Sequence, residues 1–274
     1  FMLGISSWYI LRKKELEVFK PSFVAGAIVG VIGSFLLLMT GHTQGQEMRI
    51  YQPMKLASIE ALWNTEQPAS FSLLTIGDLT GKQEVWSIRV PYLTSFLACN
   101  NFDCEIQGVN QLQAEYEARY GPNDYVPLMV VTYWSFRIMV GLEVIMLFAS
   151  AFALFVVLRN WSPKLIKWLK WMPYLIPLPF IAGVAGWVTT EMGRQPWIVQ
   201  GLLTTAQAVS PNLTVAMVST TLVSFTLLYS VLALVMFRLM YKFARQGTQA
   251  ALTKSVDVEE PTNTGNIIII GAQD

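Results

Sequence analysis

Residues 127–158 read PLMVVTYWSFRIMVGLEVIMLFASAFALFVVL, and this run decides the fold class. It is apolar apart from Arg137 and Glu143. A helix needs about 20 predominantly apolar residues to cross the hydrocarbon of a bilayer, and the run is longer than that. The sequence therefore predicts a transmembrane helix here.

The composition of the whole chain agrees with a membrane protein. Of its 274 residues, 53% are hydrophobic and only 14% are charged, whereas soluble domains carry about 25% charged residues. The 19 basic residues are balanced by 18 acidic ones, which argues against a nucleic-acid binder. With Cys99 and Cys104 as its only cysteines, the chain cannot be a disulfide scaffold.

Three further uncharged runs have the length of a membrane span, and they cover residues 23–40, 172–190 and 213–237. Pro21 and Ser22 precede the first run and are typical of a helix start. Residues 1–11 are apolar but too short to span a bilayer, and they lack the features of a signal peptide. We expect them to be the second half of a helix, in a chain that is the C-terminal part of a longer protein.

Basic residues predict the orientation of these spans. They gather in residues 12–20, in 159–170 and after 237, and the positive-inside rule places those stretches in the cytoplasm. Residues 41–126 and 192–212 then lie outside. The longer outer segment exceeds a plain connector, so we expect it to be folded and functional.

Within this outer segment, apolar spacing predicts helices over 53–63 and 111–120, with short strands over 70–90. Cys99 and Cys104 both lie there, where oxidation is permitted, so we predict a disulfide between them. Two free thiols are the alternative, since the pair still has to meet disulfide geometry.

Polar residues inside predicted spans are costly and raise a functional question by default. Arg137 and Glu143 lie within one span, and Glu191 lies at the outer end of the next. The alternatives are an arginine that snorkels to the headgroups and carboxylates that are paired or solvated. Met139 shares a helix face with Glu143, four residues on, and by itself indicates ordinary packing. His42 is the only histidine, and we interpret it as a solvated polar cap.

Four motifs together resemble subunit I of the cytochrome bd-type quinol oxidases. They are FMLGISSWY at 1–9, QPMKLASIEA at 52–61, YWSFRIMV at 133–140 and GWVTTEMGRQPW at 186–197. The motifs fall in the order of that family, and the likeness covers nearly the whole chain except the tail. The part of the outer segment after Glu60 is short and resembles the short-loop branch of the family.

The resemblance implies a quinol site and a haem site. Lys55 and Glu60 match the lysine and glutamate that bind quinol in the outer loop. Met139 matches an axial ligand of the low-spin haem b, and Arg137 matches the arginine beside that haem. A thioether ligand suits low-spin iron used for electron transfer.

The resemblance also implies a catalytic site near the end of the span at 172–190. Glu191 matches the carboxylate ligand of the high-spin haem b, and Trp187 matches the tryptophan between the haems. Arg194 matches an arginine that contacts haem propionates, for which its planar fork is suited. The histidine haem ligands of the family lie upstream of Phe1.

The implied fold is an all-α integral membrane helix bundle, with four complete and one partial transmembrane helices and a long extracytoplasmic loop. Its parts are 1–40 with the partial and first complete helix, the quinol-binding loop 41–126, three helices with haem-site residues over 127–245, and a cytoplasmic tail 246–274. The implied location is the cytoplasmic (inner) membrane of a bacterium or archaeon, as a multi-pass protein.

The implied activity is oxidation of quinol at the outer face and reduction of dioxygen to water. Its cofactors would be low-spin and high-spin haem b and a third haem of d or b type. Its partners would be subunit II, a small accessory single-helix subunit, quinol, dioxygen and membrane lipid, with no nucleic acid.

Two other functions remain open at this point. A secondary transporter with an outer domain would use Arg137 and Glu191 as substrate or proton sites, although the chain lacks the internal repeats expected of one. A structural subunit without haem, such as subunit II of the same enzyme, is the other.

Overall fold

The computed structural model describes residues 1–78 and 83–246. The chain divides into two compact units, Phe1–Ala208 and Val209–Asp274. Within the described part of the second unit, residues Val215–Gln246 form helix α9, and the segment Val215–Phe243 is long and apolar enough to cross a membrane. The predicted tail lies outside the described residues from 247 onward.

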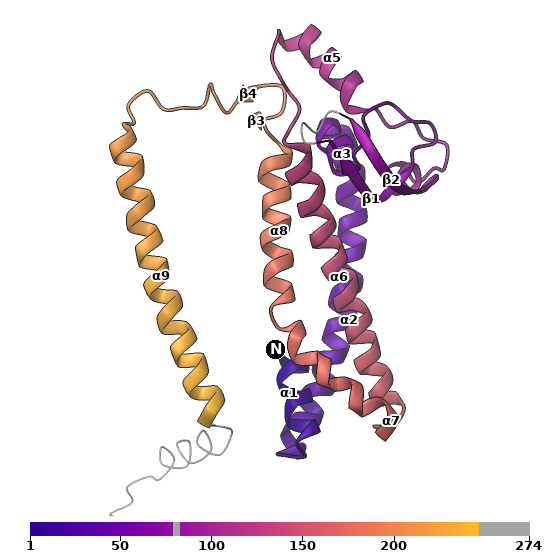
Figure 1. Cartoon of the computed structure of the whole chain (residues 1–274), viewed down its shortest axis with the longest axis vertical. Helices are drawn as coiled ribbons and strands as arrows, with labels where there is room; N and C mark the ends of the chain where they lie inside the picture. The colour runs from indigo at the N-terminus through magenta and orange to yellow at the C-terminus, as the bar shows by residue number, and fades with distance from the viewer. Residues whose placement is uncertain (79–82, 247–274) are drawn as a thin grey trace, which may run out of the picture. The chain divides into compact units, whose positions relative to one another are not determined.

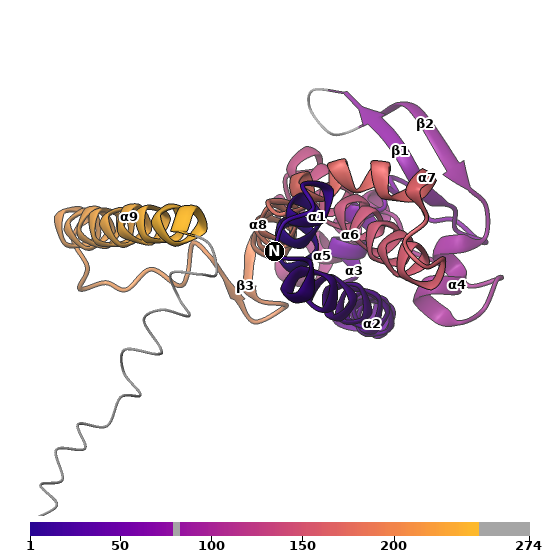
Figure 2. The same ribbon diagram turned by 90° about the horizontal axis from the view of Figure 1, so that it is seen from below.

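The first unit is built around α6 (Met129–Leu158), which packs against both α2 (Leu16–Tyr51) and α8 (Leu178–Gly193) (Figure 1). At one end of this bundle, α1 (Met2–Leu11) packs against α2 and against the 3-10 helix η1 (Lys167–Leu175) (Figure 2). Both α2 and α6 are long and apolar enough to cross a membrane. The predicted helix at 127–158 is therefore confirmed as α6.

Helix α2 extends beyond the predicted apolar run at both ends. It begins at Leu16 rather than at Pro21, which lies inside the helix, and it continues to Tyr51. Hydropathy reports how apolar a segment is, whereas helical hydrogen bonding continues wherever the residues permit it. The polar residues 41–51 contain no proline, so the helix runs on into the segment that was expected to be a loop.

The predicted span at 172–190 is built from two helical pieces with a bend between them. Helices α7 (Pro163–Ile166) and η1 precede α8, and the combined helix Pro163–Leu175 is bent by 45° relative to α8. Pro173, Pro177 and Pro179 lie around the bend, and each lacks the N–H that a continuous α-helix needs. Among the described residues, three helices can cross a membrane, or four if the bent pair is one span.

The outer segment folds into short elements at the other end of the first unit (Figure 1). These are α3 (Pro53–Ile59), an antiparallel hairpin of β1 (Phe71–Gly77) and β2 (Glu84–Val90), α4 (Leu93–Cys99) and α5 (Val109–Tyr120). The predicted strands and the second predicted helix are confirmed. The first predicted helix ends early, at Ile59, because Ala61 adopts a left-handed conformation with φ of 48°. Sequence reasoning missed α4 and the small antiparallel pair of β3 (Trp197–Val199) and β4 (Leu203–Thr204).

The disulfide between Cys99 and Cys104 is present, which confirms the prediction. Arg49, near the end of α2, donates from Nη1 to Cys104 Sγ at 2.9 Å. The disulfide therefore lies against the outer end of α2 and joins the outer segment to the bundle.

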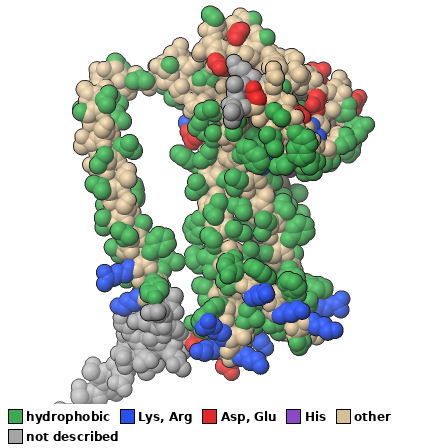
Figure 3. All heavy atoms as spheres, viewed as in Figure 1, with side chains coloured by type: hydrophobic (Ala, Val, Ile, Leu, Met, Phe, Trp, Pro, Cys, Tyr) green, Lys and Arg blue, Asp and Glu red, His purple; other side chains and the backbone are tan. Residues whose placement is uncertain are grey.

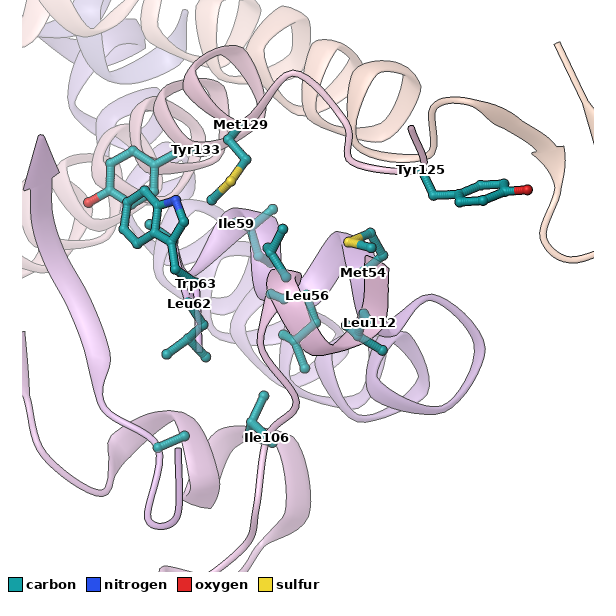
Figure 4. Packing of buried hydrophobic residues seen from close by; sticks show 14 of the residues in the cluster. Met54, Leu56, Ile59, Leu62, Trp63, Ile106, Leu112, Tyr125, Met129 and Tyr133 are labelled. Carbon is teal, nitrogen blue, oxygen red and sulfur yellow. The ribbon is translucent and has the colours of Figure 1, made fainter. Parts of the chain in front are cut away.

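Helix α3 lies at the centre of the outer core. A helix of seven residues is too short to be stable alone, so packing must hold it. Every residue after Pro53 is buried. Around it pack Leu62, Trp63, Ile106, Leu112, Tyr125, Met129 and Tyr133 (Figure 4). Each fully buried leucine contributes about 1.5–3 kcal/mol, which gives α3 a fixed position over the bundle.

Charge is distributed unevenly over the first unit (Figure 3). Lysine and arginine side chains gather at the end that carries α1 and α7, whereas acidic side chains gather over the outer segment. The basic end contains Arg12, Lys13, Lys14, Lys164, Lys167 and Lys170. This separation agrees with the orientation that the positive-inside rule predicts.

Candidate functional site

Glu60 and Arg137 form a buried ion pair between the outer segment and α6. Arg137 Nη2 donates to Glu60 Oε2 at 2.8 Å and Nη1 reaches Oε1 at 3.5 Å. The side chains of Arg137 and Glu60 are 10% and 4% exposed. The backbone N–H of Ser72, on β1, donates to the same carboxylate at 3.2 Å. The fold thus joins two predicted site residues that lie 77 positions apart.

Burial raises the pKa of Glu60 above its ordinary value of 4.5. The charge and hydrogen bonds of Arg137 oppose this rise, as do the Ser72 N–H and the charge of Arg89, but burial is the larger effect. The carboxylate consequently accepts a proton more readily than an exposed glutamate does.

The hairpin β1–β2 holds Glu60 from the other side. Arg89 donates to the backbone carbonyl of Glu60 at 3.3 Å and to that of Ala61 at 2.6 Å. The Ser72 hydroxyl lies 2.7 Å from the hydroxyl of Tyr133, on α6. Sequence reasoning missed these three supporting residues. Tyr133 lies in the motif YWSFRIMV, and Arg89 is the basic residue of β2 (EVWSIRV), but no signal pointed to Ser72.

Three aromatic rings surround the guanidinium of Arg137. Its carbon lies 4.7 Å from the ring centre of Phe71, 4.9 Å from that of Tyr133 and 5.2 Å from that of Phe136. Arg137 Nε is buried and has no hydrogen-bond partner among the described residues. One planar N–H of this arginine is therefore available to a further acceptor.

Lys55, Glu191 and Arg194 form a second cluster, where α3 meets the end of α8. Arg194 Nη2 donates to Glu191 Oε2 at 2.5 Å, and both side chains are about one-third exposed. Burial, and then the charge of Arg194, lower the pKa of Lys55 below 10.5, while Glu191 opposes this. A Cβ atom on Gly193 would lie 3.1 Å from Lys55 Cγ and 3.0 Å from Thr132 Cγ2, so glycine permits this close approach.

A cavity of about 1110 Å³ lies between α1, α2, α6 and α8. Lys55, Glu60 and His42 line it from the outer elements, and Met139 and Glu143 line it from α6. Its volume is slightly above the about 300–1,000 Å³ that is common for ligand sites. His42 Nε2 also lies 2.9 Å from Asn100 Oδ1 and from Gln46 Nε2, as expected for a polar cap.

Glycine forms much of the cavity wall. The lining glycines are Gly4, Gly26, Gly30, Gly33, Gly41, Gly45, Gly183 and Gly186. At Gly33, Gly41, Gly45 and Gly183 a Cβ atom would meet open space. At Gly186 it would lie 2.8 Å from Met139 Sδ, so the thioether rests directly on the α8 backbone.

The catalytic residues predicted from the resemblance lie elsewhere. Neither Trp187 nor Glu191 is among the described residues that line this cavity. Trp187 is 66% exposed on α8, and Glu191 follows it four residues later, on the same helix face. The structure therefore places Met139 on the cavity wall and Glu191 outside the cavity. Lys55 belongs to both places, because it lines the cavity and also lies in the cluster with Glu191 and Arg194.

The cavity fits the haem that the resemblance implies. Its volume leaves room for a macrocycle, and Met139 offers a thioether, a ligand that suits low-spin iron. Arg137 Nε and Arg194 Nε are both buried without a partner among the described residues, but neither arginine lines this cavity, so the fit rests on the open wall and on Met139.

Comparisons with known proteins agree with one another. Cytochrome bd ubiquinol oxidase subunit 1 from Bacillus subtilis is 38% identical over 91% of this chain and 53% of its own length. Cytochrome bd-II ubiquinol oxidase subunit 1 from Escherichia coli is 28% identical over 96% of this chain and 61% of its own length. A solved structure of bd oxidase from Geobacillus thermodenitrificans matches with a TM-score of 0.73 and 26% identity, over 90% of this chain and 54% of that one.

The chain thus spans a little over half the length of the relatives that it matches. The family model for cytochrome bd terminal oxidase subunit I matches residues 1–248. On this match, the chain belongs to the cytochrome bd terminal oxidase subunit I family.

Proposed function

We propose that the chain is part of a terminal quinol oxidase, which oxidises quinol at its outer face and passes electrons through haems to reduce dioxygen to water. One observation carries the proposal: Lys55 and Glu60 line the same cavity as Met139. An electron donor held by the first two residues and an acceptor held by the third would share one continuous space.

In this proposal, Glu60 takes the proton of a quinol hydroxyl as the electron leaves. Its raised pKa and its position on the cavity wall suit a proton acceptor. Arg137 orients the carboxylate through two hydrogen bonds and offsets its charge. Lys55, whose pKa is lowered, donates a hydrogen bond to the other oxygen of the headgroup.

Haem b, low-spin at Met139 and high-spin at Glu191, together with a third haem of d or b type, would supply one-electron transfer and the binding of dioxygen. Met139 would hold the first iron by its thioether, and Arg137 Nε would donate to a propionate. Glu191 would ligate the second iron through its carboxylate, with Trp187 on the same face of α8.

The proposed setting is the cytoplasmic (inner) membrane of a bacterium or archaeon. Subunit II, a small single-helix subunit and lipid would cover the apolar surfaces that α2, α6 and α9 expose. Protons from quinol would be released outside, whereas protons for dioxygen reduction would be taken from the cytoplasm. The alternative of a secondary transporter receives no support, because the matching family and the Bacillus subtilis relative are oxidase subunits and the similar solved structure is a bd oxidase.

The visible spectrum and the quinol turnover of the purified full-length oxidase test this proposal. Glu60→Gln and Lys55→Met should each lower quinol oxidation at least tenfold and leave the haem bands unchanged. Glu47→Gln is the matched control, because Glu47 is an exposed carboxylate at the outer end of α2, and it should oxidise quinol normally. A wild-type protein without haem bands, or normal turnover in both site variants, would refute the proposal.

A further inference from the structure

Glu143 is a carboxylate residue in the apolar middle of α6. It takes part in none of the ion pairs between described residues, and it has no role in the proposed quinol site. It lines the large cavity. Its Oε1 atom is buried and has no hydrogen-bond partner among the described residues. An ionisable group at membrane depth is costly, and such groups usually mark a proton, ion or substrate path.

Among the described residues that line the cavity with Glu143, the one lysine or arginine is Lys55, which comes from α3 in the outer segment. Among the described lining residues, the other charged or titratable groups are His42, Lys55 and Glu60, and all three come from the outer elements. Glu60 already pairs with Arg137, which lies about 9 Å from Glu143 along the α6 axis. The basic residues of η1, Lys167 and Lys170, do not line the cavity.

The lining residues on the other neighbouring elements are uncharged at this depth. From α2 they include Gly30, Gly33 and Ser34, and from α8 they include Ala182 and Gly183. A charge that arises inside the cavity would therefore act on Glu143 with little competition from nearby ions, in surroundings that screen charge weakly.

Met139 and Glu143 are four residues apart on α6, about 6 Å along the helix axis and on one face. Both line the cavity. We propose that Glu143 is the proton acceptor that titrates together with reduction of the redox group held at Met139. The inference rests on the proposed function, because it requires a group that changes charge at Met139.

Quinol would give up one electron to the group at Met139 and one proton to Glu60, and the Glu143 carboxylate would take up one further proton at Oε1 from the aqueous phase. When the electron moves on, that proton would return to the aqueous phase. An oxidised, positively charged group would favour the ionised carboxylate, and its reduction would remove that attraction. Glu143 thus acts through charge compensation and not as an iron ligand.

A redox titration of the low-spin haem in the full-length oxidase tests this role over a range of pH. In the wild type, the ratio of reduced to oxidised haem at a fixed potential should change by up to about tenfold per pH unit, which is about 59 mV for one electron. Glu143→Gln keeps the shape of the side chain and should remove most of this dependence. Glu143→Asp, which keeps the carboxylate, should retain it.

Glu17→Gln is the matched control, since Glu17 is an exposed carboxylate in the first turn of α2 and does not line the cavity. It should titrate like the wild type. An unchanged pH dependence in Glu143→Gln, or a wild-type haem whose potential does not depend on pH, would overturn the inference and leave the proposed function intact. A wild type without a low-spin haem would instead refute the proposed function.

Infrared difference spectra give a second measurement, and its first result comes from the wild type alone. Reduction should produce the C=O stretch of a newly protonated carboxyl group, and this band should be missing from Glu143→Gln. Its absence from the wild type would contradict proton uptake by Glu143.

Discussion

The buried pair of Glu60 and Arg137 gives a prediction whose size can be worked out from its surroundings. Replacing Arg137 by methionine keeps a long apolar side chain but removes the positive partner of Glu60. The carboxylate, 4% exposed, then keeps one direct donor, the N–H of Ser72 at 3.2 Å. Too little water reaches the site to replace the lost hydrogen bonds.

Removing one partner of a buried ion pair typically costs about 3–5 kcal/mol. The three rings around the Arg137 guanidinium add about 0.5–1 kcal/mol each where they are accessible, and more where they are dry. We therefore expect Arg137→Met to lower the free energy of unfolding by about 5–8 kcal/mol at pH 8. Much of this cost arises from the stranded carboxylate, so Glu60→Gln in the same chain should recover about 2 kcal/mol of it.

The cost should also depend on pH, with a definite sign. The pKa of Glu60 in the folded protein lies above its ordinary value of 4.5, and loss of Arg137 raises it further. Between 4.5 and that raised value the native state binds more protons than the unfolded state, so stability falls as pH rises. Acidification should therefore restore stability to Arg137→Met, by up to about 1.4 kcal/mol per pH unit within this window.

A double-mutant cycle on the full-length protein in detergent, followed by denaturant unfolding at pH 5.5 and pH 8, measures both effects. The four proteins are the wild type, Arg137→Met, Glu60→Gln and the double variant. Strictly additive losses, or a loss in Arg137→Met that is equal at the two pH values, would refute the reasoning.

Three glycine and lysine positions give further predictions. Gly186→Ala places a Cβ atom 2.8 Å from Met139 Sδ, so we expect a shifted or lost low-spin haem band. Gly183→Ala, whose Cβ atom meets open space, should leave the band unchanged. Equal spectra for the two variants would contradict the prediction. Gly193→Ala should displace Lys55, lower the free energy of unfolding by about 1–3 kcal/mol and raise the KM for quinol several-fold. An unaltered KM would count against a quinol contact by Lys55. Because burial lowers the pKa of Lys55, the unfolded state binds more protons just below pH 10.5, so stability should rise with pH there. Lys55→Met should abolish that rise, and an identical pH profile would show that Lys55 does not cause it.

The sequence predicted the elements whose signal is local. Residues 127–158 predict α6 because they are apolar apart from Arg137 and Glu143, and the spacing of apolar residues in 111–120 predicts α5. The disulfide was predictable because Cys99 and Cys104 are close in the chain and both lie in the outer segment. These features follow from neighbours along the chain, which a reader of the sequence can see.

Contacts between distant residues were not predictable in the same way. Arg137 was visible as an isolated charge in α6, but ten acidic residues lie in 41–126 and nothing in the pattern identifies Glu60 as its partner. The family resemblance separately marked both residues without joining them. The bend before α8 was missed because hydropathy does not register that Pro173 and Pro177 interrupt hydrogen bonding.

Helix α2 continues without a break from the apolar run into the outer segment. The number of helical residues after the apolar run therefore determines where the outer segment is held. Residues 41–51 add about 16 Å of helix, at about 1.5 Å and 100° per residue. His42 and Arg49 on this stretch contact Asn100 and the Cys99–Cys104 disulfide. Inserting a single residue between them would lift the distal contact by about 1.5 Å and rotate it by about 100°. The number of residues in this stretch therefore determines the height and the angle of the outer segment over the cavity. We expect the stretch to tolerate substitutions far better than insertions or deletions.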